Sequence, residues 1–333
     1  MDPLSQAAIG AAAAQSISKR GHRIAHALWI GALAGLAPDL DVFIQSNDDP
    51  LLFLEYHRQF THSLFFIPIG AWLCALAFHP LIKRHFLFWE VWLLTLAGCA
   101  THGLLDACTT YGTQLFWPFS NSRVAWHNIS VIDPIFTVPL LIFVLLAALK
   151  RSRKLAVLGF CWALGYLMFG FIQHQRAIST LEQVVAERGH TPSRLEVKPG
   201  FGNILVWKGI YEFGNRYYVD GIRVGYDLDL IPGESVAKLD VETDFPWLNS
   251  NSQQAKDIER FRWFSDDWLA IDQRDRSLIV DMRYSQLPNA IKGLWGIRIS
   301  KDRLDFKHVE WIARRETTDS ELRQFFEQLK GEF

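Results

Sequence analysis

Four short polar clusters interrupt the apolar stretch of residues 36–119: PDLD (38–41), HRQFTHS (57–63), HGLLD (102–106) and TTYG (109–112). Their histidines and aspartates offer imidazole nitrogens and carboxylate oxygens, which are ligands that zinc and manganese prefer. Ionisable groups are expensive to bury beside lipid unless they pair with one another or bind an ion. The clusters therefore predict one metal site with six candidate ligands: Asp39, Asp41, His57, His62, His102 and Asp106.

The composition is typical of a membrane protein with a soluble part. Of the 333 residues, 50% are apolar and 21% are charged, and the apolar residues concentrate in the first half. The 13 tryptophans and 24 phenylalanines are the aromatic excess expected where rings sit at membrane interfaces. A formal net charge of −1 provides no basic field for nucleic acid, so we exclude that class of partner.

The cysteines give no sign of a disulfide framework. All four fall in or beside apolar segments and none forms a CxxC pair: Cys74, Cys99, Cys108 and Cys161. We therefore predict no structural disulfides. The opening Met1-Asp2-Pro3 lacks the positive n-region of a secretory signal, so we expect no cleaved signal peptide.

Residues 1–175 are predicted to form an α-helical integral membrane domain of about five spans. A span needs about 20 apolar residues to cross a hydrocarbon core of about 30 Å. Five segments approach that length, at about 24–44, 63–82, 86–105, 133–149 and 155–172. The Ala-rich helix expected at 4–17 is too short to cross alone, so it lies either in the membrane interface or inside the helix bundle.

The polar clusters fall at the ends of these segments. Pro38 ends or kinks the first one and leaves Asp39 and Asp41 on irregular backbone, where both carboxylates can turn to a shared cation. His102 and Asp106 stand four residues apart, so they share one face of a helix at its far end.

The positions of lysines and arginines predict how the chain is oriented in the membrane. They precede the first long segment and follow the second and the fourth: Lys19, Arg20, Arg23, Lys83, Arg84 and the cluster at 150–154. The positive-inside rule makes these turns cytoplasmic. The PDLD, HRQFTHS and HGLLD clusters then all fall on the extracytoplasmic side, although they played no part in setting the topology. This agreement is the strongest evidence within the sequence that the clusters meet in space.

Residues 176–333 are predicted to form a small, mostly antiparallel β domain outside the cytoplasm. The runs 203–211 and 216–224 flank Phe213-Gly214-Asn215, which is a hairpin signal with a short glycine-containing loop. Further strands are expected at 261–271, 276–284, 294–300 and 306–312, and helices at 174–189 and 318–330.

Each polar cluster also has a purely structural explanation. The histidines of HRQFTHS would cap the next helix, the His–Asp pair of HGLLD would hydrogen-bond across a helix bundle, and the aspartates of PDLD would be solvated at a helix end. All three explanations must hold together for the metal site to vanish. Arg58 has two readings of its own: its guanidinium clamps an anionic phosphate or carboxylate group, or it pairs with Glu55 or Asp41.

The order PDLD, HRQFTHS and HGLLDACTTYGTQLFWPF resembles the bacterial inner-membrane family of membrane-bound metal-dependent hydrolases (YdjM-like). That family's pattern runs PD-x-D, H-R-G-x-[ST]-H-S and H-x3-D-x2-T-x2-G. The motif match covers about residues 1–120, and the C-terminal sheet resembles an extension carried by one branch. The resemblance implies metal ligation or catalysis by the same six residues. Gln59 stands where the family usually has glycine, which predicts a slightly different turn.

The predicted function is that of a membrane-embedded metal-dependent hydrolase acting at the extracytoplasmic face on a lipid, lipid-linked or phosphoester substrate. One or two divalent cations, zinc or manganese, would acidify bound water and polarise the substrate. Asp39 or Asp106 would be the general base, and Arg58 would contact the substrate. Two alternatives stay open: a cation transporter or channel, which would place polar residues along the depth of several spans, and a non-enzymatic envelope scaffold, which would need no metal.

Overall fold

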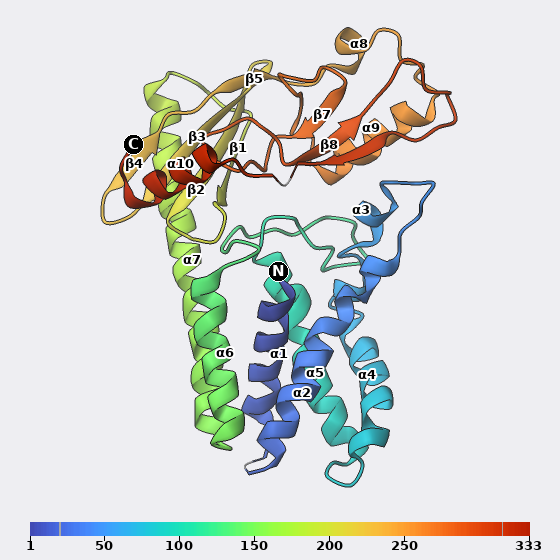
Figure 1. Cartoon of the computed structure of the whole chain (residues 1–333), viewed down its shortest axis with the longest axis vertical. Helices are drawn as coiled ribbons and strands as arrows, with labels where there is room; N and C mark the ends of the chain where they lie inside the picture. The colour runs from blue at the N-terminus through green and yellow to red at the C-terminus, as the bar shows by residue number, and fades with distance from the viewer. Residues whose placement is uncertain (20, 315) are drawn as a thin grey trace. The chain divides into compact units, whose positions relative to one another are not determined.

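The computed structural model describes residues 1–19, 21–314 and 316–333, and these form two compact units (Figure 1). Arg20, one of the basic residues behind the predicted orientation, lies outside the described residues. We call the units the helical unit and the sheet unit. The helical unit comprises Met1–Phe43, Tyr56–Ile172 and Phe201–Asn203, and the sheet unit comprises Ile44–Glu55, Gln173–Gly200 and Ile204–Phe333.

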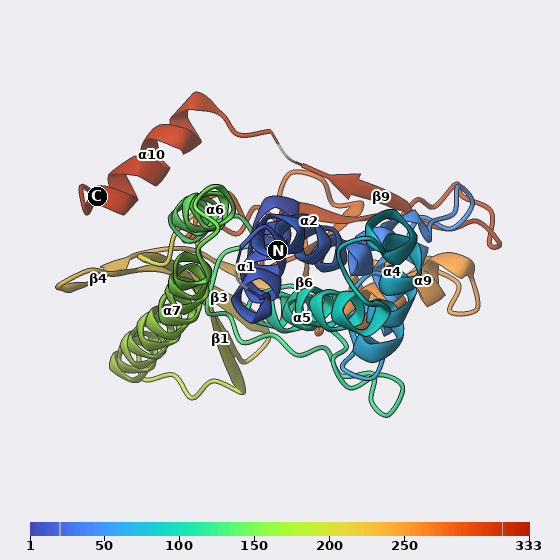
Figure 2. The same ribbon diagram turned by 90° about the horizontal axis from the view of Figure 1, so that it is seen from below.

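The helical unit is a bundle in which α1 lies against α2, α5 and α6 (Figure 2). Two 3-10 turns, η1 (Ala37–Phe43) and η2 (Phe60–His62), carry polar clusters between the helices. The helices are α1 (Pro3–Ile17), α2 (Arg23–Leu36), α4 (Ile67–Ile82), α5 (Phe88–Ala107), α6 (Pro134–Leu149) and the first part of α7 (Arg153–Glu187).

The N-terminal helix α1 lies inside this bundle, which decides between the two positions that the sequence left open. Asp2 caps it by accepting a hydrogen bond from the Ser5 amide, and small residues let its neighbours approach closely. A Cβ on Gly31 of α2 would lie 2.3 Å from the Gly10 carbonyl oxygen. Residues 8–15 are accordingly buried without interruption.

The prediction of about five membrane spans is wrong. Among the described residues one helix, α7, is long and apolar enough to cross a membrane, and a second candidate arises only if the bent pair Leu52–His62 and Ile67–Ile82 counts as one span. Helix length is the physical reason for α2 and α6, whereas α5 has 20 residues but contains Glu90, His102 and Asp106. With 14 and 16 residues, α2 and α6 reach about 21 and 24 Å at 1.5 Å per residue, short of a core of about 30 Å. The apolar segments are interrupted by polar backbone turns such as η1.

Helix α7 also differs from its prediction. The expected span at 155–172 and the expected helix at 174–189 form one continuous helix of 35 residues. Its residues up to Ile172 belong to the helical unit, and those from Gln173 belong to the sheet unit. The change from apolar to polar composition marks a change of unit and does not end the helix.

The sheet unit contains antiparallel strands, as predicted. The expected hairpin forms between β2 and β3, with Phe213 opposite Arg216. One sheet has the order β1-β2-β3-β4, with β5 also paired to β3, and the other has the order β6-β7-β8-β9. Their bounds are β1 (Arg194–Pro199), β2 (Val206–Phe213), β3 (Arg216–Val224), β4 (Leu228–Ile231), β5 (Ser235–Ala237), β6 (Leu269–Ile271), β7 (Leu278–Asp281), β8 (Trp295–Arg298) and β9 (Glu310–Ala313).

The strand expected at 261–271 is wrong over most of its length. Residues 261–264 end the helix α9 (Gln253–Phe264), and only Leu269–Ile271 is strand. Ser252 caps α9 by accepting from the Ala255 amide. The buried side chains Ile258, Phe261 and Phe264 recur every three residues, which is helical spacing. The remaining helices are α3 (Leu52–Tyr56), α8 (Val241–Asp244) and α10 (Asp319–Lys330), the last of which matches the predicted helix at 318–330.

Candidate metal centre

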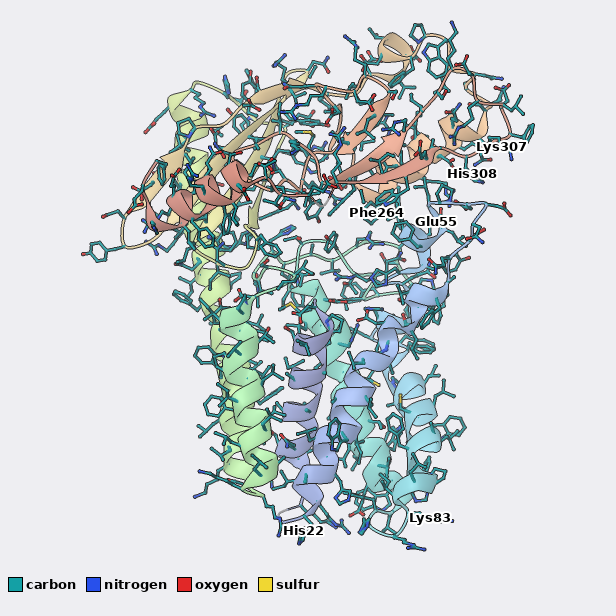
Figure 3. The ribbon with its side chains drawn as sticks, in the orientation of Figure 1. His22, Glu55, Lys83, Phe264, Lys307 and His308 are labelled. Atoms are coloured by element: carbon teal, nitrogen blue, oxygen red, sulfur yellow. The ribbon has the colours of Figure 1, made fainter. Side chains whose placement is uncertain are left out.

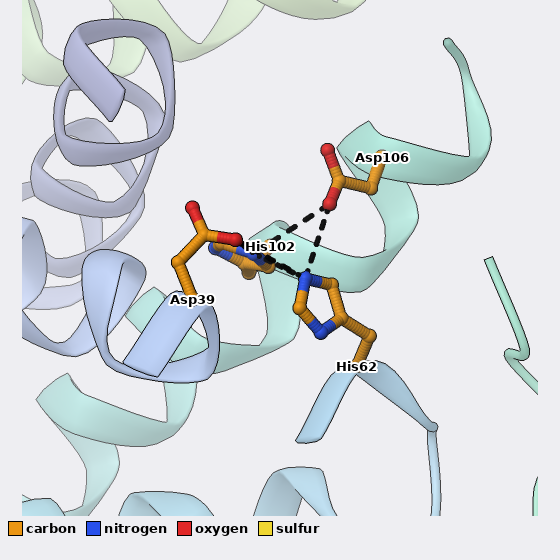
Figure 4. Close-up of side chains that lie close together, drawn as sticks. All are labelled: Asp39, His62, His102 and Asp106. Carbon is orange, nitrogen blue, oxygen red and sulfur yellow. Dashed lines mark hydrogen bonds and ion pairs between the residues drawn. The ribbon is translucent and has the colours of Figure 1, made fainter. Parts of the chain in front are cut away.

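Three segments of the helical unit bring predicted ligands together. Turn η1 carries Asp39, turn η2 carries His62, and the last turns of α5 carry His102 and Asp106. Figure 4 shows these four side chains pointing toward one another. One donor atom of each lies within 4.8 Å of the donor atoms of the other three. We call these four residues the metal centre.

Four of the separations between the donor atoms are close to those around a tetrahedral zinc ion. The His62 Nε2 atom lies 3.4 Å from Asp39 Oδ1 and 3.2 Å from Asp106 Oδ2. The His102 Nε2 atom lies 3.3 Å and 3.6 Å from the same two oxygens. Ligands that each stand about 2.0 to 2.1 Å from a tetrahedral ion are about 3.3 Å from one another. The two Nε2 atoms are closer to each other, at 2.8 Å, so they would move apart for an ion of that size to bind all four atoms.

Hydrogen bonds at the far side of each ring direct both Nε2 atoms at the centre. The Nδ1 atom of His102 lies 2.5 Å from the Gly35 carbonyl oxygen, which can only accept, so Nδ1 carries the proton. The Nδ1 atom of His62 lies 2.9 Å from Thr61 Oγ1, whose hydroxyl donates to Asp41 at 2.6 Å. In this arrangement His102 Nε2 faces His62 Nε2 at 2.8 Å and Asp39 Oδ1 at 3.3 Å, and a cation among these atoms would take the place of a shared proton.

The carboxylate of Asp106 also fits a bound cation. Its Oδ1 atom accepts from Gln6 Nε2 at 3.1 Å, lies 3.3 Å from an Arg58 nitrogen, and pairs with the amino group of Met1. Its Oδ2 atom is buried and has no hydrogen-bond partner among the described residues. Leaving a buried carboxylate oxygen unsatisfied is costly. A cation beside the two histidines would satisfy it.

Asp41 and His57 lie beside the metal centre. With Asp39 they form a second group whose donor atoms lie within 4.8 Å of one another. Asp41 is already surrounded, because its Oδ1 atom lies 2.8 Å from His57 Nδ1 and its Oδ2 atom accepts from the Arg58 amide at 3.1 Å. The same Oδ2 atom lies 3.2 Å from His62 Nδ1. A carboxylate in that position orients a ligand histidine.

The surrounding hydrogen bonds keep the aspartates of η1 ionised. Burial alone would raise the pKa of Asp39, but hydrogen bonds with His102 and His62 outweigh burial and hold that pKa well below its usual value. Burial likewise opposes ionisation of Asp41, and hydrogen bonds with His57 and His62 again lower its pKa. Both carboxylates are therefore available to a cation at neutral pH.

Arg58 contacts the centre through Asp106. Its side chain is buried, and it also donates to Thr109 Oγ1 at 3.0 Å, while its guanidinium carbon lies 5.3 Å from the centre of the Tyr111 ring. These partners differ from the predicted side-chain pairing with Glu55 or Asp41. The left-handed backbone of this turn is at Arg58, whose φ is 65°, whereas Gln59 has a φ of −100°. Gln59 therefore replaces glycine without a left-handed backbone.

The sequence reasoning missed Gly103, which allows η2 to approach α5. A Cβ on Gly103 would lie 2.2 Å from the His62 carbonyl oxygen, so a side chain at this position would push His62 away from His102. The signal was present as the glycine that follows His102 in HGLLD. Gln6, which donates to Asp106, was also missed, because a single polar residue carries no pattern. Thr61 and Thr109 lie in the quoted clusters, but their bonds to Asp41 and Arg58 were not predicted.

Comparison with known proteins identifies a family. The family described as "YdjM inner membrane protein" matches residues 1–177, which confirms the resemblance read from the motifs. The chain is 34% identical over 119 residues to "Uncharacterized protein YfhP" of Bacillus subtilis (strain 168), and the match covers 33% of this chain and 34% of that protein. The chain thus spans about a third of the length of that relative. No solved structure matches.

Proposed function

The chain belongs to the YdjM inner membrane protein family, and on that premise we propose that it is a metal-dependent hydrolase. Asp39, His62, His102 and Asp106 would hold one divalent ion, zinc or manganese. The observation that carries the proposal is the unsatisfied set of donors, which is two facing Nε2 atoms and the orphaned Oδ2 of Asp106. The two Nε2 atoms contact each other and the carboxylate oxygens of Asp39 and Asp106, and a divalent ion would take the place of the proton that these contacts share.

A divalent ion bound there supplies Lewis acidity and acidifies bound water. Asp106 is buried and held by Arg58, so it serves as a fixed ligand. Asp39 is the half-buried member of the set, with 27% of its side chain exposed. Asp39 is therefore the better of the two candidates for general base, through the carboxylate oxygen that would not hold the ion. In this scheme Arg58 acts by holding Asp106 and does not clamp the substrate.

The proposed substrate is a lipid, a lipid-linked intermediate or another phosphoester at the membrane. Helix α7 exposes large apolar side chains, including Leu164, Met168 and Phe169, and such surface suits contact with lipid. The basic cluster at 150–154 precedes this helix, which by the positive-inside rule puts that end in the cytoplasm and the sheet unit outside. His22 and Lys83 lie together at one end of the helical unit (Figure 3), at the ends of α2 and α4 away from η1 and η2. His22 and Lys83 thus mark the end of the helical unit opposite the metal centre.

The test is hydrolysis by the full chain, purified in detergent and loaded with zinc or manganese. Release of phosphate from phosphatidic acid and of fatty acid from phosphatidylglycerol would be measured separately, because they report phosphoester and acyl cleavage. Asp39→Asn is expected to lower the rate at least about 100-fold, in the range that loss of a general base produces. His22→Ala, outside the centre, provides the control. Equal rates in the wild type, Asp39→Asn and metal-stripped protein on every substrate cleaved would contradict the proposal, and so would no hydrolysis of any of them.

A further inference from the structure

One segment of the sheet unit joins two parts of the candidate metal site. Residues Ile44–Glu55 belong to the sheet unit, although the chain before them forms η1 and the chain after them leads to His57 and η2. Asp41 stands three residues before this segment and His57 two residues after it. Whatever fixes the segment therefore restrains both flanks of the site through a few covalent bonds.

Apolar contacts hold the middle of the segment. Leu51 and Leu54 are 1% and 6% exposed, and both belong to a core cluster that contains Ile258 and Phe261 of α9. Burying two leucines contributes about 1.5–3 kcal/mol each. The segment is thus an integral part of the sheet unit.

A single guanidinium contacts the segment at two points, Asp49 near its middle and Glu55 at its end. Two nitrogens of Arg260 donate to the two carboxylate oxygens of Asp49 at 2.9 and 2.8 Å, and its Nε donates to Glu55 at 2.5 Å. Arg260 is itself fixed by Asp257, which is fully buried and accepts from it at 3.0 Å. His308 supports Asp257 from the other side, with its Nδ1 at 2.9 Å, and Figure 3 labels Glu55 and His308 in this region.

We infer that Arg260 is a positioning residue for the metal centre, acting through Ile44–Glu55. The inference rests on the proposed metal site. Ordering a chain segment costs about 1–2 kcal/mol per residue, and a two-pronged, charge-assisted contact at Asp49 with a third bond at Glu55 restricts the segment between them. With Arg260 in place, the short stretches that join the segment to Asp41 and His57 have less conformational freedom before any ion binds. Without it, part of the binding energy of the ion is spent on ordering the segment.

The experiment measures zinc affinity of the full chain by competition with a chelator. Arg260→Gln is expected to weaken zinc binding about 10-fold or more, the size of effect that supporting residues around a metal have. The matched control is Arg262→Gln on the same helix, because Arg262 pairs with Glu259 and Asp267, outside the segment. Arg260→Lys keeps the positive charge but cannot make the two-pronged contact with Asp49, so its zinc affinity is expected to lie between those of Arg260→Gln and the wild type.

Amide hydrogen exchange separates positioning from general damage. In the metal-free protein Arg260→Gln should speed exchange over residues 41–62 and leave β6–β9 unchanged. If Arg260→Gln also speeds exchange in β6–β9, Asp49→Asn becomes the test variant. This substitution removes the two-pronged contact at Asp49 and leaves the bond between Arg260 and Asp257. The variant that counts is the one that speeds exchange in residues 44–55 alone. If its zinc affinity equals that of the wild type, the inference is overturned. Zinc binding without any hydrolysis would defeat the proposed function but not this inference, and no zinc binding in the wild type would defeat both.

Discussion

The metal centre and a charged cluster in the sheet unit both bury ionisable side chains, but they differ in how these groups are satisfied. In the sheet cluster Asp281 receives two bonds from Arg283, at 2.9 and 2.7 Å, and Lys208 donates to Ser285 Oγ at 2.8 Å and to the Ala290 carbonyl at 2.6 Å. In the metal centre two imidazole nitrogens face each other and Asp106 Oδ2 has no hydrogen-bond partner among the described residues. Buried charge therefore does not by itself indicate a site; a donor set that the chain leaves incomplete does.

The largest effect expected from this comparison is loss of metal from His102→Ala. His102 supplies one of the facing Nε2 atoms, so its removal leaves three donors and should weaken zinc binding about 100-fold or more, beyond the 10- to 100-fold effects of supporting residues. Metal content after dialysis and chelator competition would measure it. His22→Ala, an exposed histidine of the same unit, should bind zinc as the wild type does. Equal zinc affinity in the two variants would remove His102 from the site.

The second largest effect is expected for Gly103→Ala, which tests how closely η2 approaches α5. The added Cβ would lie 2.2 Å from the His62 carbonyl oxygen, and such overpacking typically costs about 1–3 kcal/mol. Both thermal stability and zinc affinity should fall. Gly165→Ala in α7 is the matched control, since a Cβ there meets nothing within 4 Å, and alanine favours a helix. A Gly103→Ala protein as stable as Gly165→Ala would show that the approach of η2 to α5 is looser than described.

Asp41→Asn should have a moderate effect. An amide keeps the size of the side chain but loses the charge that faces His62 Nδ1 and His57 Nδ1, so zinc affinity should fall about 10-fold, as for other residues that orient ligand histidines. The same chelator competition measures it. A loss as large as that of His102→Ala would make Asp41 a direct ligand, as the sequence predicted, and not a supporting residue.

Lys208→Met should leave zinc binding unchanged, and its effect should appear only in stability against pH. Burial lowers the pKa of Lys208 to about 7, whereas an unfolded lysine titrates near 10.4. Between these values the unfolded chain binds more protons, so the free energy of unfolding should rise with pH by up to about 1.4 kcal/mol per unit. The variant should flatten that rise in chemical denaturation at pH 7 and 9. If the free energy of unfolding of Lys208→Met rose with pH as steeply as that of the wild type, a group other than Lys208 would be titrating.

The same contrast explains what the sequence could and could not predict. The candidate ligands were found because each cluster combines histidine or aspartate with an apolar surrounding, a pattern visible in one chain. The assignment of Asp41 to a supporting position needed coordinates, since PDLD offers two equivalent aspartates. The number of spans was predicted wrongly because hydropathy over a window does not register a turn such as η1. The helical end of α9 was missed because FRWF reads equally as strand when its spacing to Ile258 is ignored.

The partners of Ile44–Glu55 were beyond sequence reasoning. Asp49 and Arg260 are separated by more than 200 residues, and no local pattern links them. The same holds for Arg58, in the turn before η2, whose carboxylate partner Asp106 lies in α5. Long-range ion pairs of this kind become visible only when the fold is known.

X-ray absorption at the zinc edge of the purified full chain tests the central claim most directly. Two imidazole nitrogens and two carboxylate oxygens at about 2.0 to 2.2 Å are predicted, with about one zinc per chain and a spectrum that changes in His102→Ala. The contrary result would be a spectrum with sulfur near 2.3 Å, pointing to the cysteines, or one that is identical in His102→Ala. Either would mean that the clustered donors of Asp39, His62, His102 and Asp106 do not form a metal site.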